Sequence, residues 1–229
     1  MTFQKFSRMV MVSVEGLCRD FYRDNRATIR IKKEEVAVKN LTTIVNTTLK
    51  LSYKKGFDGM SLRDLSRESG LSMGALYSYF ASKEELLSMI QYHGRGAVEK
   101  ILRDHIDQDS DPGSKLRNAV RTHLYLSELM KSWFYFFFME TKNLNKKYRK
   151  ISVESELMTE RFITDILEEG VRKKIFAVDN IPLAGSVIKA MMQDWYLKQW
   201  KYTQRNISVE TYAQFVIGVV ESFVIKNKK

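Results

Sequence analysis

The residues SLRDLSRESGLSMGALYSYFASKEEL, numbered 61–86, decide how the chain is interpreted. A serine precedes each of three short stretches within them, at Ser61, Ser72 and Ser82. A serine hydroxyl in that position accepts a hydrogen bond from a free backbone N–H in the first turn of a helix. Asp64 and Glu85 each follow a serine by three residues, which is the capping-box pattern. The stretch therefore predicts three consecutive helices that begin near residues 61, 72 and 82.

The first two of these helices have the spacing of a helix-turn-helix, in which two helices cross through a turn of three to four residues. Gly70 stands where the turn is expected to need a positive φ, which glycine adopts without penalty. Ser66 is small where the two helices approach most closely. Four leucines are expected to form the small shared core: Leu62, Leu65, Leu71 and Leu76.

The second helix of the motif is expected to run from about Ser72 to Tyr79. It would project Met73, Gly74, Tyr77 and Ser78 outward. In a helix-turn-helix, the N-terminal residues of the second helix meet base edges in the major groove of DNA. A cluster of three helices with a purely structural role would need neither Gly74 nor exposed tyrosines. The pattern therefore favours DNA binding.

The remainder of the chain also predicts helices. The whole chain of 229 residues has only two prolines, and the stretches between glycines are rich in residues that favour helices. The third helix of the motif is expected to continue from Ser82 to about His105, and residues 107–114 to form a loop. Further helices are expected at 7–24, 34–54, 115–130, 132–141, 146–174, 183–204 and 208–226. The predicted fold class is all-α, with an N-terminal three-helix DNA-binding domain and a larger C-terminal helical domain.

Charge and hydropathy narrow the function classes without locating a site. The net charge of +11 suggests a polyanionic partner. However, residues 1–88 hold 15 Lys and Arg against 10 Asp and Glu, and residues 89–229 hold 23 against 17, so the excess is spread out. No apolar run approaches the ~20 residues that cross a bilayer, and the first 20 residues do not fit a secretory signal. The expected location is the cytoplasm, with no membrane partner.

The sequence gives little support for a catalytic or metal-binding site. Cys18 is the one cysteine, which excludes an internal disulfide, and the three histidines are not spaced as metal ligands. Glycine-rich phosphate loops and nucleophile elbows are absent from the sequence. Asp165, Glu168 and Glu169 precede a basic run and are interpreted as a solvated helix face. The chain is therefore expected to be neither an enzyme nor the holder of a cofactor or metal.

The motif resembles the N-terminal region of the TetR family of bacterial regulators. The resemblance rests on Gly56-Phe57, on residues 61–80 and above all on LYSYF at 76–80 followed by SKEELL at 82–87. It covers about residues 36–88 strongly and the rest only by architecture. The residues that it implies for DNA binding are Ser61, Arg63, Ser72, Met73, Gly74, Tyr77, Ser78, Tyr79 and Lys83.

The family pattern gives these residues expected roles. Ser61, Lys83 and the hydroxyls of Tyr77 and Tyr79 would contact phosphates. Gly74 would let the backbone approach DNA closely. Met73 stands where the family often has a polar residue, so apolar contact and DNA shape would carry more of the specificity.

The N-terminal residues 1–33 form an extension longer than the family usually has. In one hypothesis Arg26, Arg30, Lys32 and Lys33 reach DNA. In the other, which we favour from the sequence, a helix packs its apolar face on the body or the partner subunit and adds modest electrostatic help. The predicted domains are this extension (1–33), a DNA-binding domain (34–88) and a ligand-binding and dimerisation domain (89–229).

The C-terminal half is expected to bind a small hydrophobic effector, because the resemblance implies a ligand pocket there. Aromatic residues and methionines would make it large and adaptable. The candidate ligand-binding residues are His123, Met130, Trp133, Phe137, Met191 and Trp195, with Tyr125, Gln193 and Asp194 as further polar anchors. The basic residues Lys146, Lys147, Arg149 and Lys150 would hold acyl-CoA phosphates or form a solvated loop. A long-chain acyl-CoA or fatty acid and another lipophilic effector both remain open.

The helices at 183–204 and 208–226 are the expected seam of a homodimer, which would place two recognition helices on a near-palindromic operator. The apolar stripe assigned to this seam is Ala213, Val216, Ile217, Val220, Phe223 and Val224, with Gly218 permitting close approach. Effector binding would shift the helix from Ser82 and release DNA, so the expected function is a ligand-responsive regulator, in the common mode a repressor. The alternative is a helical ligand-binding protein without specific DNA binding.

Overall fold

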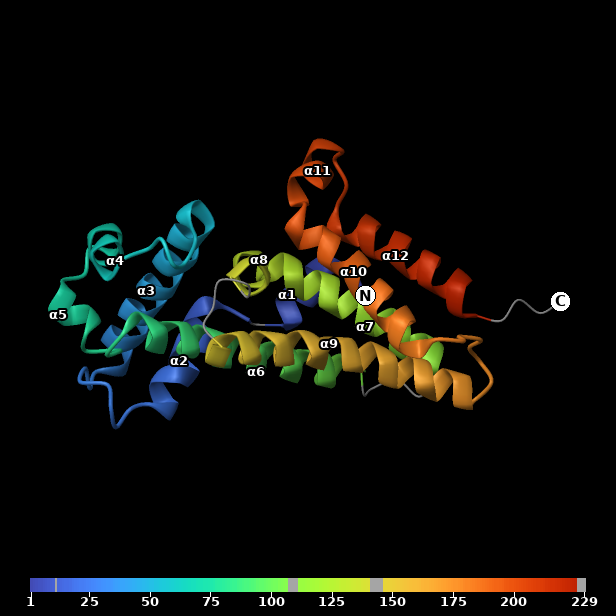
Figure 1. The fold of residues 1–229 in the computed structure, drawn as a ribbon, viewed down its shortest axis with the longest axis horizontal. Coiled ribbons are helices and arrows are strands. Elements are labelled where there is room, and N and C mark those ends of the chain that lie inside the picture. Colours follow the sequence, from blue (N-terminus) through green and yellow to red (C-terminus); the bar gives the residue numbers. More distant parts are fainter. Residues whose placement is uncertain (11, 107–110, 141–145, 226–229) are drawn as a thin grey trace. The chain divides into compact units, whose positions relative to one another are not determined.

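The computed structural model describes residues 1–10, 12–106, 111–140 and 146–225, with side chains left out for 146–148 and 151. The described residues form α-helices joined by short loops (Figure 1). They are α1 (Phe3–Met9), α2 (Val14–Asp24), α3 (Glu34–Lys55), α4 (Leu62–Ser69), α5 (Met73–Leu76), α6 (Lys83–Ile106), α7 (Pro112–Leu129), α8 (Lys131–Glu140), α9 (Lys146–Arg172), α10 (Ile181–Leu197), α11 (Gln199–Gln204) and α12 (Val209–Val224). The all-α prediction is confirmed. None of the described helices is both long and apolar enough to cross a membrane.

Two of the predicted helices are each divided in two. The helix expected at 7–24 is interrupted because Val10 leaves the helical conformation and Ser13 caps a new helix, accepting a 3.0 Å hydrogen bond from the Gly16 amide. The helix expected at 183–204 breaks at Lys198, whose φ of −124° and ψ of 35° are not helical. The loop expected at 107–114 ends earlier than predicted, because Asp111 caps α7 and Pro112 occupies its first position.

The described chain folds into two compact units, each built from segments that are distant in sequence. The N-terminal unit contains the described residues within 11–97 and 132–153. The C-terminal unit contains those within 1–10, 98–131 and 154–229. α1 and α2 therefore belong to different units, and so do α7 and α8. The division into an extension, a DNA-binding domain and a ligand-binding domain concerns function and stays a prediction.

Each unit has its own apolar core. In the N-terminal unit, α2 packs along α3 and buries Tyr22, Leu41 and Ile44 completely. In the C-terminal unit, α7 packs against α10 and α12, with Val120 and Leu124 fully buried on α7. Burying such side chains contributes about 1.5–3 kcal/mol each. These cores fix the surfaces on which the functional residues lie.

Candidate nucleic-acid interface

The helix-turn-helix is built from α4, α5 and the turn between them. Gly70 ends α4 in the left-handed conformation with a φ of 71°, so the predicted positive φ is confirmed. The Ser66 hydroxyl donates a 2.6 Å hydrogen bond to the Leu71 carbonyl across this turn. Leu65 and Leu76, one from each helix, are fully buried. The motif therefore rests on backbone geometry and on a small shared core.

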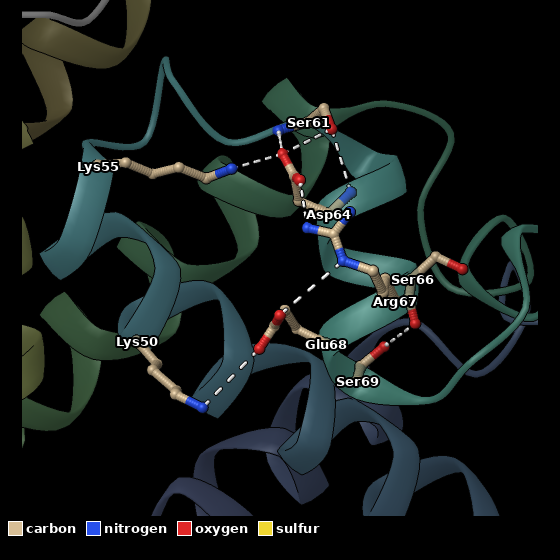
Figure 2. A network of polar contacts seen from close by, with 8 residues as sticks. All are labelled: Lys50, Lys55, Ser61, Asp64, Ser66, Arg67, Glu68 and Ser69. Carbon is tan, nitrogen blue, oxygen red and sulfur yellow. Dashed lines mark hydrogen bonds and ion pairs between the residues drawn. The ribbon is translucent and has the colours of Figure 1, made fainter.

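Asp64 organises the start of α4 (Figure 2). Its carboxylate accepts hydrogen bonds from the Ser61 amide at 3.0 Å and from the Ser61 hydroxyl at 2.8 Å, and the Ser61 oxygen accepts from the Asp64 amide at 3.1 Å. The predicted capping box is thus confirmed. Lys55 and Arg67 also reach the same carboxylate, at 2.6 and 3.0 Å. The Lys55 ammonium, together with the Ser61 bonds, holds the pKa of Asp64 far below its usual value.

α5 is only four residues long, shorter than the predicted recognition helix. The Ser72 hydroxyl caps it by accepting a 3.2 Å hydrogen bond from the Ala75 amide. Beyond Leu76 the chain continues as a turn, where the Ser78 hydroxyl donates to the Gly74 carbonyl at 3.1 Å. The exposed residues of this segment are Ser72, Gly74 and Tyr77, and Met73 is half-buried. A side chain added at Gly74 would meet no closer atom than the Ser72 hydroxyl at 4.0 Å, so its outer face is open.

The expectation that Tyr79 is exposed is wrong. Its side chain is buried, and its hydroxyl accepts a 2.9 Å hydrogen bond from the side-chain amide of Asn40 on α3. Burial raises the pKa of the Tyr79 hydroxyl, and the bond from Asn40 partly offsets that rise. Two tyrosines that look equivalent in sequence thus differ, because Tyr79 turns into the core after α5 ends. Asn40 carries no sequence signal that would have connected it with the motif.

Lys83 and Arg63, two of the residues expected to contact DNA, differ in how free their side chains are. The Lys83 ammonium donates a 3.0 Å hydrogen bond to the Asp58 carbonyl and lies 4.6 Å from the centre of the Phe57 ring. Burial lowers the pKa of Lys83. Arg63 is exposed on the first turn of α4. Lys83 therefore serves first to fix the loop before α4 to the start of α6.

The six predicted ligand-binding residues are divided between the two units. Trp133 and Phe137 belong to the N-terminal unit, where their rings stack at 6.2 Å. They lie so close to Gly94 of α6 that an added Cβ there would come within 2.7 Å of Trp133. The residues in the C-terminal unit are His123, Met130, Met191 and Trp195. Of the predicted basic cluster, the side chains of Lys146 and Lys147 lie outside the described residues, and Arg149 and Lys150 are exposed.

The C-terminal unit contains a buried polar cluster that the sequence predicted only in part. The Lys189 ammonium on α10 lies 3.4 Å from Nε2 of His123 and 3.6 Å from the Glu156 carboxylate. Gln193, a predicted polar anchor, hydrogen-bonds the same carboxylate. Burial and the neighbouring Lys189 charge lower the pKa of His123 well below its usual value, which keeps the ring neutral. Trp195 donates to Glu128 at 3.0 Å.

The prediction that an apolar stripe on α12 forms the dimer seam is wrong for most residues of the stripe. Five of its six side chains, those of Ala213, Val216, Ile217, Val220 and Val224, are buried, because α12 packs this face against α7 and α10 of its own chain. Phe223 alone of the six is exposed. The large apolar side chains that α10 and α12 expose instead are Leu183, Val187, Phe215, Val219 and Phe223.

Two family models match the chain. The model described as "Bacterial regulatory proteins, tetR family" matches residues 44–90, which include α4 and α5. The model described as "Tetracyclin repressor-like, C-terminal domain" matches residues 109–220. Together they span both the candidate interface and the C-terminal helices.

Curated and solved relatives agree with these matches. The HTH-type transcriptional regulator HbdR of Aromatoleum sp. (strain CIB) is 22% identical over 186 residues, which cover 81% of either chain. A bacterial regulatory protein of the tetR family from Rhodococcus RHA1 superposes with a TM-score of 0.73 at 19% identity, covering 81% of this chain and 97% of that one. The regulator FadR from Bacillus subtilis, solved in complex with stearoyl-CoA, gives a TM-score of 0.64 at 17% identity and covers 78% of this chain and 96% of that one.

Proposed function

Since the chain belongs to the tetR family of bacterial transcriptional regulators, we propose that it is a homodimeric repressor that a hydrophobic effector releases from a near-palindromic operator. One observation carries this proposal. α5 is held from behind by buried Leu76 and presents Ser72, Gly74 and Tyr77 to solvent. A short helix fixed in this way, with a bare backbone at Gly74, suits close approach to base edges in the major groove.

The proposed dimer is supported by apolar side chains left exposed on two neighbouring helices. Phe215, Val219 and Phe223 follow each other at intervals of four along α12, and Phe215 and Phe223 are 70% and 60% exposed. Leu183 and Val187 have the same spacing on the adjoining α10 and are 61% and 52% exposed. Exposed apolar side chains gathered on neighbouring helices are typical of an interface. A second copy would cover it with its own α10 and α12 in a two-fold, four-helix arrangement.

The proposed effector is a long-chain acyl-CoA or fatty acid. The C-terminal unit combines an extensive apolar interior with a buried polar cluster at Lys189 and His123, where the Lys189 ammonium is paired with the Glu156 carboxylate. Such a combination suits a ligand with a long apolar chain and a polar head. The FadR relative solved with stearoyl-CoA offers a precedent within the same fold. A regulator of this kind would act in the cytoplasm, where the chromosome and acyl-CoA are found together.

Fluorescence anisotropy tests the proposal. A labelled duplex from upstream of the protein's own gene would be titrated beside a scrambled duplex at fixed salt, and palmitoyl-CoA would then be added. We expect tight binding to the first duplex only, with a 5- to 150-fold loss of affinity on adding palmitoyl-CoA, since allosteric couplings are typically ~1–3 kcal/mol. Specific binding unaffected by palmitoyl-CoA or palmitate would overturn the effector class. Equal, weak binding to both duplexes and to duplexes selected from a random pool would overturn the regulator and favour a ligand-binding protein.

A further inference from the structure

The loop between α2 and α3, residues 25–33, is attached to the end of the recognition segment. The Arg30 amide donates a 3.2 Å hydrogen bond to the carbonyl of Ser78, two residues beyond α5. Figure 1 shows the loop passing beside the segment that follows α5, within the same unit. A segment far from the helix-turn-helix in sequence therefore lies next to it in space.

The loop is held in one conformation by its own contacts. Ile29 is 1% exposed and anchors the loop in the core. The hydroxyl of buried Tyr22 donates a 2.8 Å hydrogen bond to the Lys32 carbonyl. The Lys32 ammonium donates to the carbonyls of Arg26 at 3.0 Å and Ile29 at 2.8 Å. Because Lys32 is used to close the loop, its charge is the least available of the four basic residues.

The remaining three basic side chains of the loop point away from this packing. Arg26, Arg30 and Lys33 are exposed, and no ion pair joins them to an acidic group anywhere in the described parts of the chain. The Glu34 carboxylate, which follows Lys33 directly in the sequence, is engaged by Arg19 at 3.1 Å and Arg23 at 3.3 Å. The loop therefore combines a fixed backbone with three exposed cations that none of these contacts uses.

We propose that Arg26, Arg30 and Lys33 bind DNA phosphates beside the base pairs that α5 reads. The proposal rests on the proposed DNA-binding function and extends its contact surface to residues that the family match at 44–90 does not include. With four residues at 1.5 Å each, α5 is about 6 Å long, and the major groove is about 12 Å wide. Cations fixed at the end of so short a helix lie within reach of the phosphates that border the groove.

Packing and DNA binding are served by different side chains of the same segment. Tyr22 and Ile29 pack, and Lys32 closes the loop, so removal of these residues would disturb the fold. The three exposed cations can be removed without touching that packing. Arg30→Ala also keeps the backbone amide that bonds Ser78. The two hypotheses that the sequence left open for this segment are therefore compatible and separable by mutation.

The test compares two triple variants that lower the net charge equally. One is Arg26→Ala, Arg30→Ala, Lys33→Ala. The matched control is Arg161→Ala, Arg172→Ala, Arg205→Ala, which removes three exposed arginines of the C-terminal unit. The affinity of each full-length protein for a duplex selected from a random pool, and for a scrambled duplex, would be measured across 50–300 mM salt. Thermal unfolding would verify that both variants are folded.

Each phosphate contact contributes about 0.9 to the slope of log K against log salt concentration. We expect the loop variant to lower the steepness of that slope by about 2 to 3 for each protomer, or about 5 for the proposed dimer, on both duplexes, while the control keeps the wild-type slope. The variant Arg26→Lys, Arg30→Lys, in which Lys33 is unchanged, should keep most of the wild-type slope, since lysine also neutralises phosphate. A loop variant whose slope equals that of the control would overturn the proposal, with specific DNA binding intact. A wild-type protein that fails to prefer the selected duplex would instead overturn the proposed function itself.

Discussion

Asn40 on α3 donates a 2.9 Å hydrogen bond to the hydroxyl of Tyr79, just beyond the recognition helix. Tyr77, two residues earlier, is 46% exposed and faces solvent. The two phenols therefore have separate tasks. Asn40 and Tyr79 fix the end of this segment to the first long helix of its unit, and Tyr77 is the phenol left exposed for the proposed contact with DNA.

The substitutions Tyr77→Phe and Tyr79→Phe each remove one hydroxyl and should separate these tasks. Tyr79→Phe deprives Asn40 of its acceptor and should lower the free energy of unfolding by about 0.5–1.5 kcal/mol. Tyr77→Phe should leave stability within about 0.5 kcal/mol of wild type and weaken operator binding about tenfold, because a charge-assisted bond to phosphate is lost. Urea unfolding and anisotropy measure the two effects. If Tyr79→Phe impaired binding as much as Tyr77→Phe and left stability unchanged, the assignment would be wrong.

Gly74→Ala should stabilise the protein and weaken DNA binding. Alanine is favoured over glycine in helices by about 1 kcal/mol, and the added methyl group meets no protein atom closer than the Ser72 hydroxyl at 4.0 Å. The methyl group would, however, stand where the backbone is proposed to approach DNA. Gly96→Ala is the matched control, because Gly96 is an exposed helical glycine of α6 with equally open surroundings. The control should gain stability without losing affinity, and equal affinities for both variants would count against the proposed face.

Asp64→Asn should destabilise the protein at neutral pH but not in acid. The pKa of Asp64 is lowered in the folded state by Lys55 and Ser61, so its ionised form favours folding. A depressed folded pKa contributes stability above the unfolded pKa of about 3.9 and loses it as the pH falls toward the folded value. The stability difference between wild type and Asp64→Asn should therefore shrink steadily below about pH 4. A difference that stayed constant from pH 7 to pH 2 would exclude this role of the carboxylate.

Phe215→Glu should convert the proposed dimer into a monomer. The Phe215 ring is 70% exposed in the single chain, so the substitution costs little in its own unit, but it would place a charge within the proposed interface. Sedimentation velocity would give the mass, and operator affinity should fall by at least tenfold. Gln214→Glu adds the same charge at the adjacent exposed position and should remain dimeric. A Phe215→Glu protein that sedimented as the control does would place the interface elsewhere.

The helix-turn-helix could be predicted from sequence because its determinants are local. The capping box of Ser61 and Asp64 and the left-handed Gly70 depend on residues within a few positions of one another. The burial of Tyr79 could not be predicted, because its hydroxyl bonds Asn40, which lies 39 positions away in the sequence. The prediction of which α12 residues face the partner was wrong for another reason. This helix is apolar on two faces, so periodicity alone could not tell that Val216 and Val220 face their own chain while Phe215 and Val219 face out.

The proposed recognition helix has four residues and is held by Ser72 at one end and by Arg30 and Asn40 beyond the other, which would restrict how target preference evolves. Few side chains of this segment can vary without disturbing the contacts that hold it in place. Divergence between such regulators would concentrate at Met73, Gly74 and Tyr77, while the flanking anchors change slowly. A lineage carrying this arrangement could acquire a new operator through one or two substitutions, without first passing through a poorly folded ancestor.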